Sequence, residues 1–473
     1  MLFNSYEFIL FYLPATLVGY LLLNRLRLAT AANAWLLAAS LFFYAWWNAA
    51  YLPLILGSIL FNYTIGSLLA ESNELKKRMV SKRCILVFGL VGNVALLGYF
   101  KYMDFFLGSL NAALGTDLPL LRIVLPLGIS FFTITQIAFL IDAYEGLVEE
   151  RKLLNYALFV TFFPHLLAGP ILHHKDMMPQ FDRLRNKVLN YKNLALGLFL
   201  FFVGLFKKVV IADPFSALAR AGFDTATTLN FAEAWVASLA YTLQLYFDFS
   251  GYSDMAIGAG LMFNIRLPVN FHSPYKATSI IDFWKRWHIT LTAFITTYVY
   301  TPILRSFRRI TFVKSLVAVF LAMFISGVWH GAGWTFVVWG SLHGAALVVN
   351  HLWRKRKWKM PPAVGWLLTF NFINASFVFF RASTWDDALK VFKGMLGLSG
   401  VELGRHALAA LQGDGNTWLI LTAALILALV GRNSVQLTES FRPDWKHCAF
   451  TALVACYALF NLSKVSEFLY FQF

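Results

Sequence analysis

Residues 324–340, with the sequence FISGVWHGAGWTFVVWG, place one histidine among tryptophans, glycines and aliphatic side chains. This residue, His330, lies in a run from 315 to 353 without any Lys, Arg, Asp or Glu. An ionisable side chain in so apolar a run is costly in a membrane, and it usually faces a cavity and serves a function. Gly331 and Gly333 favour a helix break directly after it. The stretch predicts two apolar helices joined by a break with a candidate functional histidine. The structural alternative is a histidine hydrogen-bonded across a helix interface.

The composition of the whole chain extends this interpretation. Of 473 residues, 59% are hydrophobic and 14% are charged, and the mean hydropathy is +0.63. Soluble domains carry about 25% charged residues. The high aromatic content, 17%, is typical of side chains at bilayer interfaces. No linker or low-complexity segment interrupts the chain, and the three cysteines form no disulfide framework. We therefore predict an all-α polytopic membrane protein with one domain over residues 1–473.

Apolar windows of about 20 residues mark the membrane spans and predict about 11 to 12 transmembrane helices. The first window, in the segment MLFNSYEFILFYLP, has no basic leader and no cleavage site, so we expect it to be retained. The windows are 6–23, 31–48, 52–70, 84–100, 124–143, 191–211, 231–250, 312–328, 334–352, 363–380, 417–431 and 447–462.

The net charge of +16 comes from short basic clusters between these windows. Such clusters are typical of cytoplasmic loops, which are rich in Lys and Arg, and they argue against nucleic-acid binding. With Arg25 and Arg27 after the first window, they place both chain termini on the outer side. The clusters are 75–83, 183–187, 305–309 and 354–359.

Two segments do not fit simple spans. Residues 153–172 are apolar but contain Pro164, Gly169 and Pro170, which predicts a re-entrant or kinked segment. Residues 244–302 mix apolar and acidic residues, and Gly251 argues against a straight helix there. Irregular backbone at membrane depth is tolerated only inside protein or beside a wet cavity. We therefore expect a central polar tunnel surrounded by the spans.

Further candidate residues lie in SIIDFWKRWHITLT (279–292), which contains His288, Asp282 and Trp287. Paired tryptophans and mixed charge predict the mouth of a cavity, while an amphipathic surface helix with snorkelling Lys and Arg is an equal alternative. Asp248 and Asp254 are expected to cap broken helix ends or to pair with Lys or Arg. No His, Cys and Asp spacing indicates a metal site, so we expect no metal.

Four motifs occur in order: QLYFDFSGYSDMAIGAG (244–260), NFHSPY (270–275), DFWKRWHITLT (282–292) and GVWHGAGWTFVVWG (327–340). Together they resemble the membrane-bound O-acyltransferase family. The nearest branch is the bacterial one that contains alginate O-acetylation proteins and D-alanyl transfer proteins of teichoic acid. The resemblance spans nearly the whole chain.

This resemblance implies that His330 is the catalytic residue and that His288 is a second polar residue of the tunnel. It implies a bacterial inner-membrane enzyme with periplasmic termini. The enzyme would pass an acetyl group from cytoplasmic acetyl-CoA, with no bound cofactor, to an exopolysaccharide of the alginate or cellulose type. Periplasmic acetyltransferase or relay proteins would be its partners besides the lipid bilayer. The C-terminal FLYFQF (468–473) matches a family motif whose tyrosine, here Tyr470, is a candidate acyl relay.

The chain departs from the family pattern at FITTYVYTPILRS (294–306). Relatives commonly have an Arg–Asp pair and a glycine turn there, whereas this chain has Thr296 and Thr297. Acceptor and donor assignments therefore stay open, and D-alanyl transfer is one alternative. A transporter or channel with structural histidines is the alternative outside enzymes, and a scaffold for a polysaccharide synthase is a third.

Acyl transfer needs a base for the hydroxyl proton and donors for the developing oxyanion. We expect His330 to be the base. The indole N–H of Trp329 or Trp334, or a backbone N–H at the helix break, is expected to be the donor.

Overall fold

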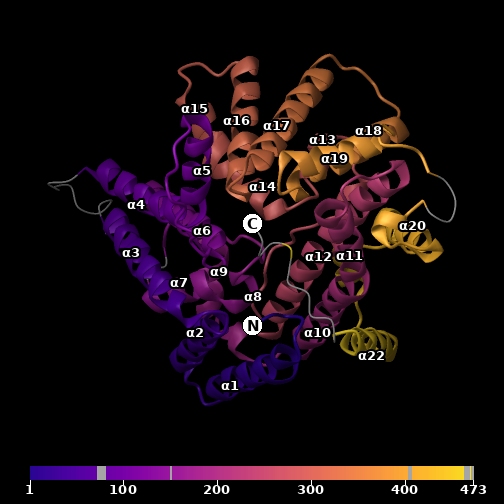
Figure 1. Cartoon of the computed structure of the whole chain (residues 1–473). Coiled ribbons are helices and arrows are strands. Elements are labelled where there is room, and N and C mark those ends of the chain that lie inside the picture. Colours follow the sequence, from indigo (N-terminus) through magenta and orange to yellow (C-terminus); the bar gives the residue numbers. More distant parts are fainter. Residues whose placement is uncertain (72–80, 150–151, 403–406, 463–468, 470–473) are drawn as a thin grey trace. The chain divides into compact units, whose positions relative to one another are not determined.

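The computed structural model describes residues 1–71, 81–149, 152–402, 407–462 and Leu469, and every regular element in these ranges is a helix (Figure 1). Six of these helices are long and apolar enough to cross a membrane, or seven if the bent pair α20–α21 forms one span. Other helices at the predicted windows are shorter or less apolar. The prediction of an all-α polytopic membrane protein is confirmed.

The described chain forms two compact units, and each is considered by itself. The prediction of one domain over 1–473 stays a prediction. The first unit comprises Met1–Phe202, Ser253–Pro268 and Arg442–Thr451, and the second comprises Val203–Tyr252, Val269–Phe441 and Ala452–Phe473.

The first unit draws on helices from both ends of the chain, and the second draws on those between. The helices that begin in the first unit are α1 (Leu13–Arg25), α2 (Ala29–Ala45), α3 (Leu52–Glu71), α4 (Lys82–Leu97), α5 (Met103–Leu114), α6 (Ile129–Glu145), α7 (Leu153–Thr161), α8 (Phe163–Leu166), α9 (His174–Asp182), α10 (Tyr191–Phe206) and α22 (Trp445–Phe460). Those that begin in the second unit are α11 (Asp213–Arg220), α12 (Phe231–Met262), α13 (Ile280–Trp284), α14 (Ile289–Ile295), α15 (Thr301–Ser306), α16 (Phe312–His330), α17 (Trp334–Lys355), α18 (Pro362–Arg381), α19 (Trp385–Met395), α20 (Gly415–Val430) and α21 (Ser434–Ser440).

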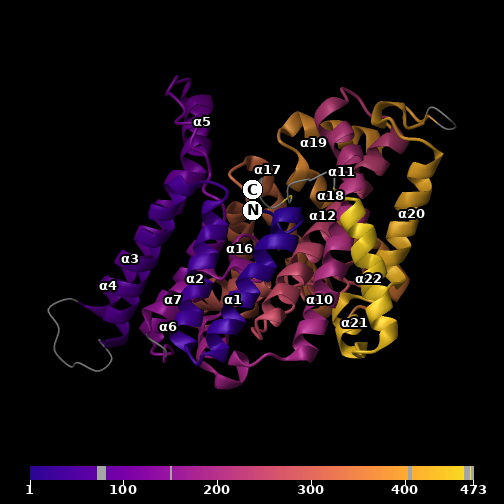
Figure 2. The ribbon, with the colours of Figure 1, turned by 90° about the horizontal axis from the view of Figure 1, so that it is seen from below.

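In the first unit, polar side chains join neighbouring apolar helices. α1 and α2 lie side by side (Figure 2), and the phenol of Tyr12 donates a hydrogen bond to the carbonyl of Ala39 at 2.8 Å. Asn62 of α3 and Asn93 of α4 exchange amide hydrogen bonds of 3.2 and 2.6 Å at buried positions. Buried amides of this kind hold transmembrane helices together, because lipid offers them no other partner.

The proline-rich segment 153–172 is broken, as its sequence predicts. α7 ends at Thr161, Phe162 leaves the helical conformation, and the short α8 begins immediately after it with Pro164 in its first turn. The break is buried, and the backbone N–H of Phe163 donates to the Ser40 hydroxyl at 3.2 Å. This agrees with the rule that irregular backbone at membrane depth must find its partners inside protein.

Two predicted windows have different bounds in the structure. The window 124–143 begins as a helix only at Ile129, because Gly128 adopts a φ of +73°. The window 231–250 belongs to a helix that continues to Met262 without a break, so the prediction that Gly251 interrupts it is wrong. A side chain on Gly251 would come within 2.7 Å of the carbonyl oxygen of Gly204. This glycine therefore permits close helix packing rather than a kink.

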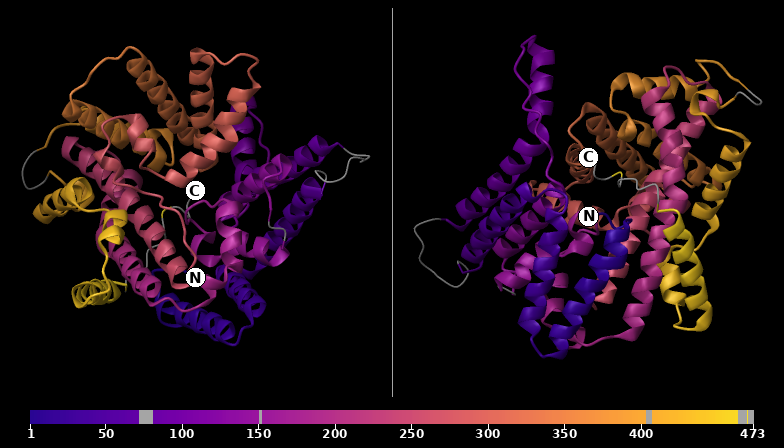
Figure 3. Two further views of the ribbon diagram at one scale, coloured as in Figure 1. Left: turned by 180° about the vertical axis from the view of Figure 1, so that it is seen from behind. Right: turned by 60° about the horizontal axis from the view of Figure 1, so that its bottom comes forward.

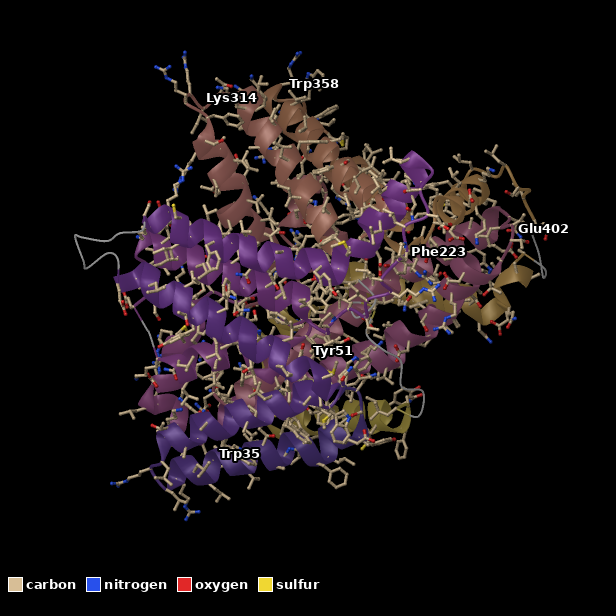
Figure 4. All side chains as sticks on the ribbon, turned by 60° about the vertical axis from the view of Figure 1, so that its left-hand side comes forward. Trp35, Tyr51, Phe223, Lys314, Trp358 and Glu402 are labelled. Atoms are coloured by element: carbon tan, nitrogen blue, oxygen red, sulfur yellow. The ribbon has the colours of Figure 1, made fainter. Side chains whose placement is uncertain are left out.

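The second unit contains the hairpin of α16 and α17, which are joined by the extended residues Gly331–Gly333 (Figure 3, left). A side chain on Gly327 would come within 2.7 Å of the Cα of Gly340, so the two backbones touch. Lys314 and Trp358 lie together at the open end of the hairpin (Figure 4). His330 is the last residue of α16, at the closed end. The break predicted after His330 is confirmed.

Candidate active site

The loop after α12 holds His288 in place through backbone pairing. The N–H of Ile289 donates to the carbonyl of Asn270 at 2.9 Å, and the N–H of His272 donates to the carbonyl of Arg286 at the same distance. His288 itself has a φ of +44°, in the left-handed region that side chains other than glycine and asparagine seldom adopt. Such strain persists only where the surroundings impose it, and it often marks functional sites.

The side chain of Asn270 sets the tautomer of His288. The backbone N–H of Thr290, which can only donate, lies 3.3 Å from Oδ1 of Asn270, so that atom is the acceptor. Nδ1 of His288 lies 3.1 Å from the same oxygen and must therefore be the protonated nitrogen. In the neutral ring, the lone pair is then on Nε2. A histidine held in this way carries a base nitrogen of defined direction.

His330 approaches His288 from the other side of the same unit. The two ring centroids are 6.5 Å apart and the rings are tilted by 58°. His288 is 0% exposed and His330 is 4% exposed. The structure thus brings together the two histidines that the sequence singled out, more than 40 positions apart.

Aromatic rings enclose His330. The rings of Trp329 and Trp339 lie 5.0 Å from it and that of Phe380 lies 5.3 Å from it, all in edge-to-face arrangements. Trp339 is 1% exposed, and its indole N–H has no hydrogen-bond partner among the described residues. A buried donor without a partner is costly unless something else satisfies it. Trp339 was not among the candidates from the sequence.

A third histidine, His343, completes the cluster and was missed by sequence reasoning. Nδ1 of His343 accepts the indole N–H of Trp284 at 3.2 Å, and Nε2 lies 3.0 Å from the hydroxyl of Ser376. Its ring also packs against Trp339 at 4.7 Å. Both nitrogens are satisfied, so His343 fastens α13, α17 and α18 to one another. The signal that could have found it is the one that found His330: a lone histidine in an uncharged apolar run.

Two of the predicted lining tryptophans differ in position. Trp287 is 5% exposed and stacks on Phe283 with centroids 5.6 Å apart. Trp334 is 55% exposed, in contrast to Trp329, which lies against His330. The structure therefore favours Trp329 over Trp334 as a neighbour of the chemistry.

Asp282 lies in an ion pair at the surface of the unit. Its carboxylate accepts a hydrogen bond from the guanidinium of Arg286 at 2.8 Å, one helical turn away, and both side chains are about one-third exposed. The Ser279 hydroxyl caps the same helix by accepting the N–H of Asp282 at 3.2 Å. These contacts account for Asp282 as a structural residue of α13.

Asp248 and Asp254 are buried within the unbroken helix α12, so neither caps a helix break, and that part of the prediction is wrong. The expected pairing with a basic residue is present for Asp248. Its carboxylate lies 2.5 Å from the ammonium of Lys208, which is 1% exposed and also pairs with Asp213 at 2.8 Å.

The same carboxylate contacts the chain terminus. The backbone N–H of Leu469 donates to Asp248 at 3.2 Å, and Leu469 is buried. Tyr470, the candidate acyl relay, is the next residue and lies outside the described residues.

A cavity of about 350 Å³ lies beside the histidine cluster. It is lined by residues one turn away from each histidine: Thr292 after His288, and Ser326 before His330. Trp284, the partner of His343, also lines it. Most of the lining is apolar, as in sites for small organic ligands. A continuous tunnel stays a prediction. In the described ranges, no three His, Cys, Asp or Glu side chains are grouped to hold a metal ion.

Comparisons with known proteins assign this arrangement to a family. Residues 35–383 match the model of the membrane-bound O-acyltransferase family. The chain is 45% identical to a peptidoglycan O-acetyltransferase of Helicobacter pylori, over 100% of this chain and 98% of that protein. It is 36% identical to a probable alginate O-acetylase of Pseudomonas putida, over 100% of both chains. A teichoic acid D-alanyltransferase of Bacillus subtilis is 27% identical over 54% of this chain and 68% of that protein. The chain belongs to the membrane-bound O-acyltransferase family and is a multi-pass membrane acyltransferase.

Proposed function

We propose that this enzyme transfers an acetyl group from cytoplasmic acetyl-CoA, across the inner membrane, to a hydroxyl of a cell-envelope glycan. The observation that carries the proposal is the pair of buried histidines, His288 and His330, whose ring centroids are 6.5 Å apart beside an apolar cavity. Two imidazoles in a water-poor site suit the proton transfers of acyl transfer and limit hydrolysis of the thioester.

In the proposed reaction, His330 removes the proton from the acceptor hydroxyl as the oxygen attacks the thioester carbonyl. The carbon–sulfur bond then breaks, and the thiolate takes the proton from His330 to leave as free CoA. Nε2 of His288 accepts a hydrogen bond from the same hydroxyl and orients it, since Asn270 keeps the proton on Nδ1. His330 is thus the catalytic base and His288 holds the acceptor.

The developing oxyanion needs a donor, and we assign this role to the indole N–H of Trp339. Its ring lies 5.0 Å from His330, and the N–H is buried without a partner among the described residues. A donor that is kept dry and unoccupied costs no reorganisation when charge develops on the carbonyl oxygen. Trp339 takes the place of Trp334 in this role, because Trp334 is largely exposed.

The cavity beside the histidines is proposed to receive the thioester arm of the donor. Its volume, about 350 Å³, is at the lower end of the range for small-molecule sites. The hydroxyls of Thr292, Thr296 and Ser326 on its wall offer hydrogen bonds to amide groups of such an arm. Thr296 stands where relatives commonly carry a charged residue, so this chain would present a neutral wall there.

For the acceptor, we propose peptidoglycan first, because the relative at 45% identity over the full chain is named for that polymer. An exopolysaccharide such as alginate is the second candidate, favoured by the relatives named as probable alginate O-acetylases. A periplasmic acetyltransferase or relay protein is the proposed partner. The resemblance to D-alanyltransferases covers only 54% of the chain and gives less support to that substrate.

Tyr470 is proposed as an acyl relay on the periplasmic side, where both termini would lie. Its neighbour Leu469 is held by the buried carboxylate of Asp248, which fixes where the last residues leave the core. A phenol has a pKa of about 10 in model compounds, so it is a better leaving group than a sugar hydroxyl. An acetyl ester on Tyr470 would stay active for a second transfer.

The test uses the full-length protein in vesicles with radiolabelled acetyl-CoA on the cytoplasmic side and glycan fragments on the other. We expect label in the glycan with the native protein and none above background with His330→Ala. His447→Ala, at an exposed histidine of α22, is the matched control and should retain full activity. Equal labelling by His330→Ala would refute the catalytic role. Parallel trials with peptidoglycan and alginate fragments decide between the acceptors.

A further inference from the structure

A second cavity, of about 330 Å³, lies in the first unit where α9, α10 and the end of α12 meet. Arg183, Arg185 and Arg266 line it, and its other five lining residues are all glutamine or asparagine. No acidic side chain contributes to its wall among the described residues. The cavity is therefore polar and positively charged, unlike the apolar cavity beside the histidines.

The amide side chains of this cavity are fixed by hydrogen bonds to backbone groups. The side chain of Gln180 accepts the backbone N–H of Arg266 at 2.9 Å and donates to its carbonyl at 3.1 Å. The side chain of Asn264, which has a φ of +59°, donates to the carbonyls of Asn186 and Val188 at 3.1 and 2.8 Å. The scaffold uses the backbone of Arg266 and leaves its guanidinium for other contacts.

The charge of the three arginines is not neutralised within the described residues, where none of them forms an ion pair. Asp182, the acid next to Arg183, pairs instead with Lys152 at 2.5 Å. Several guanidinium groups around one cavity repel one another and favour a multivalent anion. Phosphate fits best, because its oxygens accept paired hydrogen bonds from the planar guanidinium fork.

The rim of the cavity indicates a position at the membrane edge. Leu184, Val188 and Tyr191 are 81%, 67% and 76% exposed, and they alternate in sequence with the lining residues. Exposed apolar side chains beside arginines are typical of segments that rest in the headgroup layer of a bilayer. An anion that binds here would therefore be presented at the membrane surface.

We propose that this cavity, the arginine–amide pocket of Arg183, Arg185 and Arg266, binds a phosphate-bearing anion at the membrane surface. Two sources share this chemistry: the phosphates of a soluble nucleotide such as coenzyme A, and the headgroup of an anionic phospholipid. The inference goes beyond the proposed transferase reaction, because it concerns binding by the first unit and does not depend on the histidines.

The experiment compares the full-length protein with two triple variants in which net charge falls by three. One carries Arg183→Gln, Arg185→Gln and Arg266→Gln. The control carries Arg305→Gln, Arg308→Gln and Arg309→Gln, three exposed arginines of the second unit that form no ion pair with a described residue. Binding of radiolabelled coenzyme A is measured in neutral detergent, and retention of phosphatidylglycerol is measured by native mass spectrometry.

We expect the pocket variant to lose at least about tenfold in affinity for one probe, and the control to change by less than about twofold, since each charge-assisted contact is worth about a tenfold change. Loss of coenzyme A binding identifies a nucleotide, and loss of phosphatidylglycerol identifies a lipid. If both probes bind the two triple variants equally, or if neither binds the native protein, the proposal is wrong. Single arginine variants serve if the triple variant does not fold, with the same criterion against single control variants.

Discussion

The side-chain oxygen of Asn270 lies 3.1 Å from Nδ1 of His288 and also accepts the backbone N–H of Thr290. One amide thus fixes both the backbone and the ring of a strained histidine. The relationship makes Asn270 a positioning residue for the reaction, since it acts on the acceptor through His288.

Replacing Asn270 tests this role. Asn270→Ala should lower kcat about 10- to 100-fold, the range seen when a positioning partner is lost, and Asn270→Asp should retain more activity because it keeps an acceptor oxygen. Initial rates of glycan acetylation give the measurement, with Asn371→Ala on α18 as control. Equal losses in the Ala and Asp variants would show that the acceptor oxygen is not what matters.

The indole N–H of Trp339 is the second test. Trp339→Phe keeps a ring against His330 but removes the donor, so kcat should fall by about 10² to 10³, as for loss of one oxyanion donor, while KM changes little. Trp334→Phe, at a side chain 55% exposed, is the matched control and should be nearly neutral. A Trp339→Phe enzyme with native kcat would remove the indole from the mechanism.

The ion pair of Asp248 with Lys208 should matter for stability and for the chain terminus. Asp248→Asn leaves a buried ammonium with one partner fewer, which costs about 3 to 5 kcal/mol when a buried pair is broken. Thermal unfolding in detergent measures the loss, and hydrogen exchange at the amide of Leu469 should accelerate. Asp282→Asn breaks a half-exposed pair and should cost less than about 1 kcal/mol. Similar losses in the two variants would contradict the assignment.

Tyr470→Phe tests the relay. Glycan acetylation should fall to background, because phenylalanine cannot carry an acetyl ester, while the protein keeps its native unfolding temperature. Mass spectrometry of the native protein after acetyl-CoA is added without acceptor should show one acetyl group on Tyr470. Tyr457→Phe on α22, at a side chain 56% exposed, is the control. Unimpaired acetylation by Tyr470→Phe would rule out an obligatory relay.

The sequence predicts the membrane class and the position of His330 because both depend on local composition. An uncharged run with one histidine and two glycines reads the same without knowledge of its neighbours, and the helix does break at Gly331. The proline-rich break after Thr161 is equally local, since Pro164 acts on its own helix.

Asn270, Trp339 and His343 could not be found in this way, because their roles come from residues far along the chain. Asn270 is a loop asparagine until its contact with His288 is known, 18 positions later. Gly251 shows the reverse error. Its sequence context indicates a kink, yet the helix continues unbroken because the missing side chain accommodates a neighbouring carbonyl.

The contact of Gly327 with Gly340 has a consequence for how substrates are handled. With backbone against backbone, α16 and α17 cannot slide past one another by a residue without forcing a bulky side chain into a space that admits only hydrogen. The depth of His330 relative to the two arms of the hairpin is therefore locked. Donor and acceptor must each travel to a stationary imidazole, so turnover would be governed by their routes of entry and exit rather than by movement of the histidine.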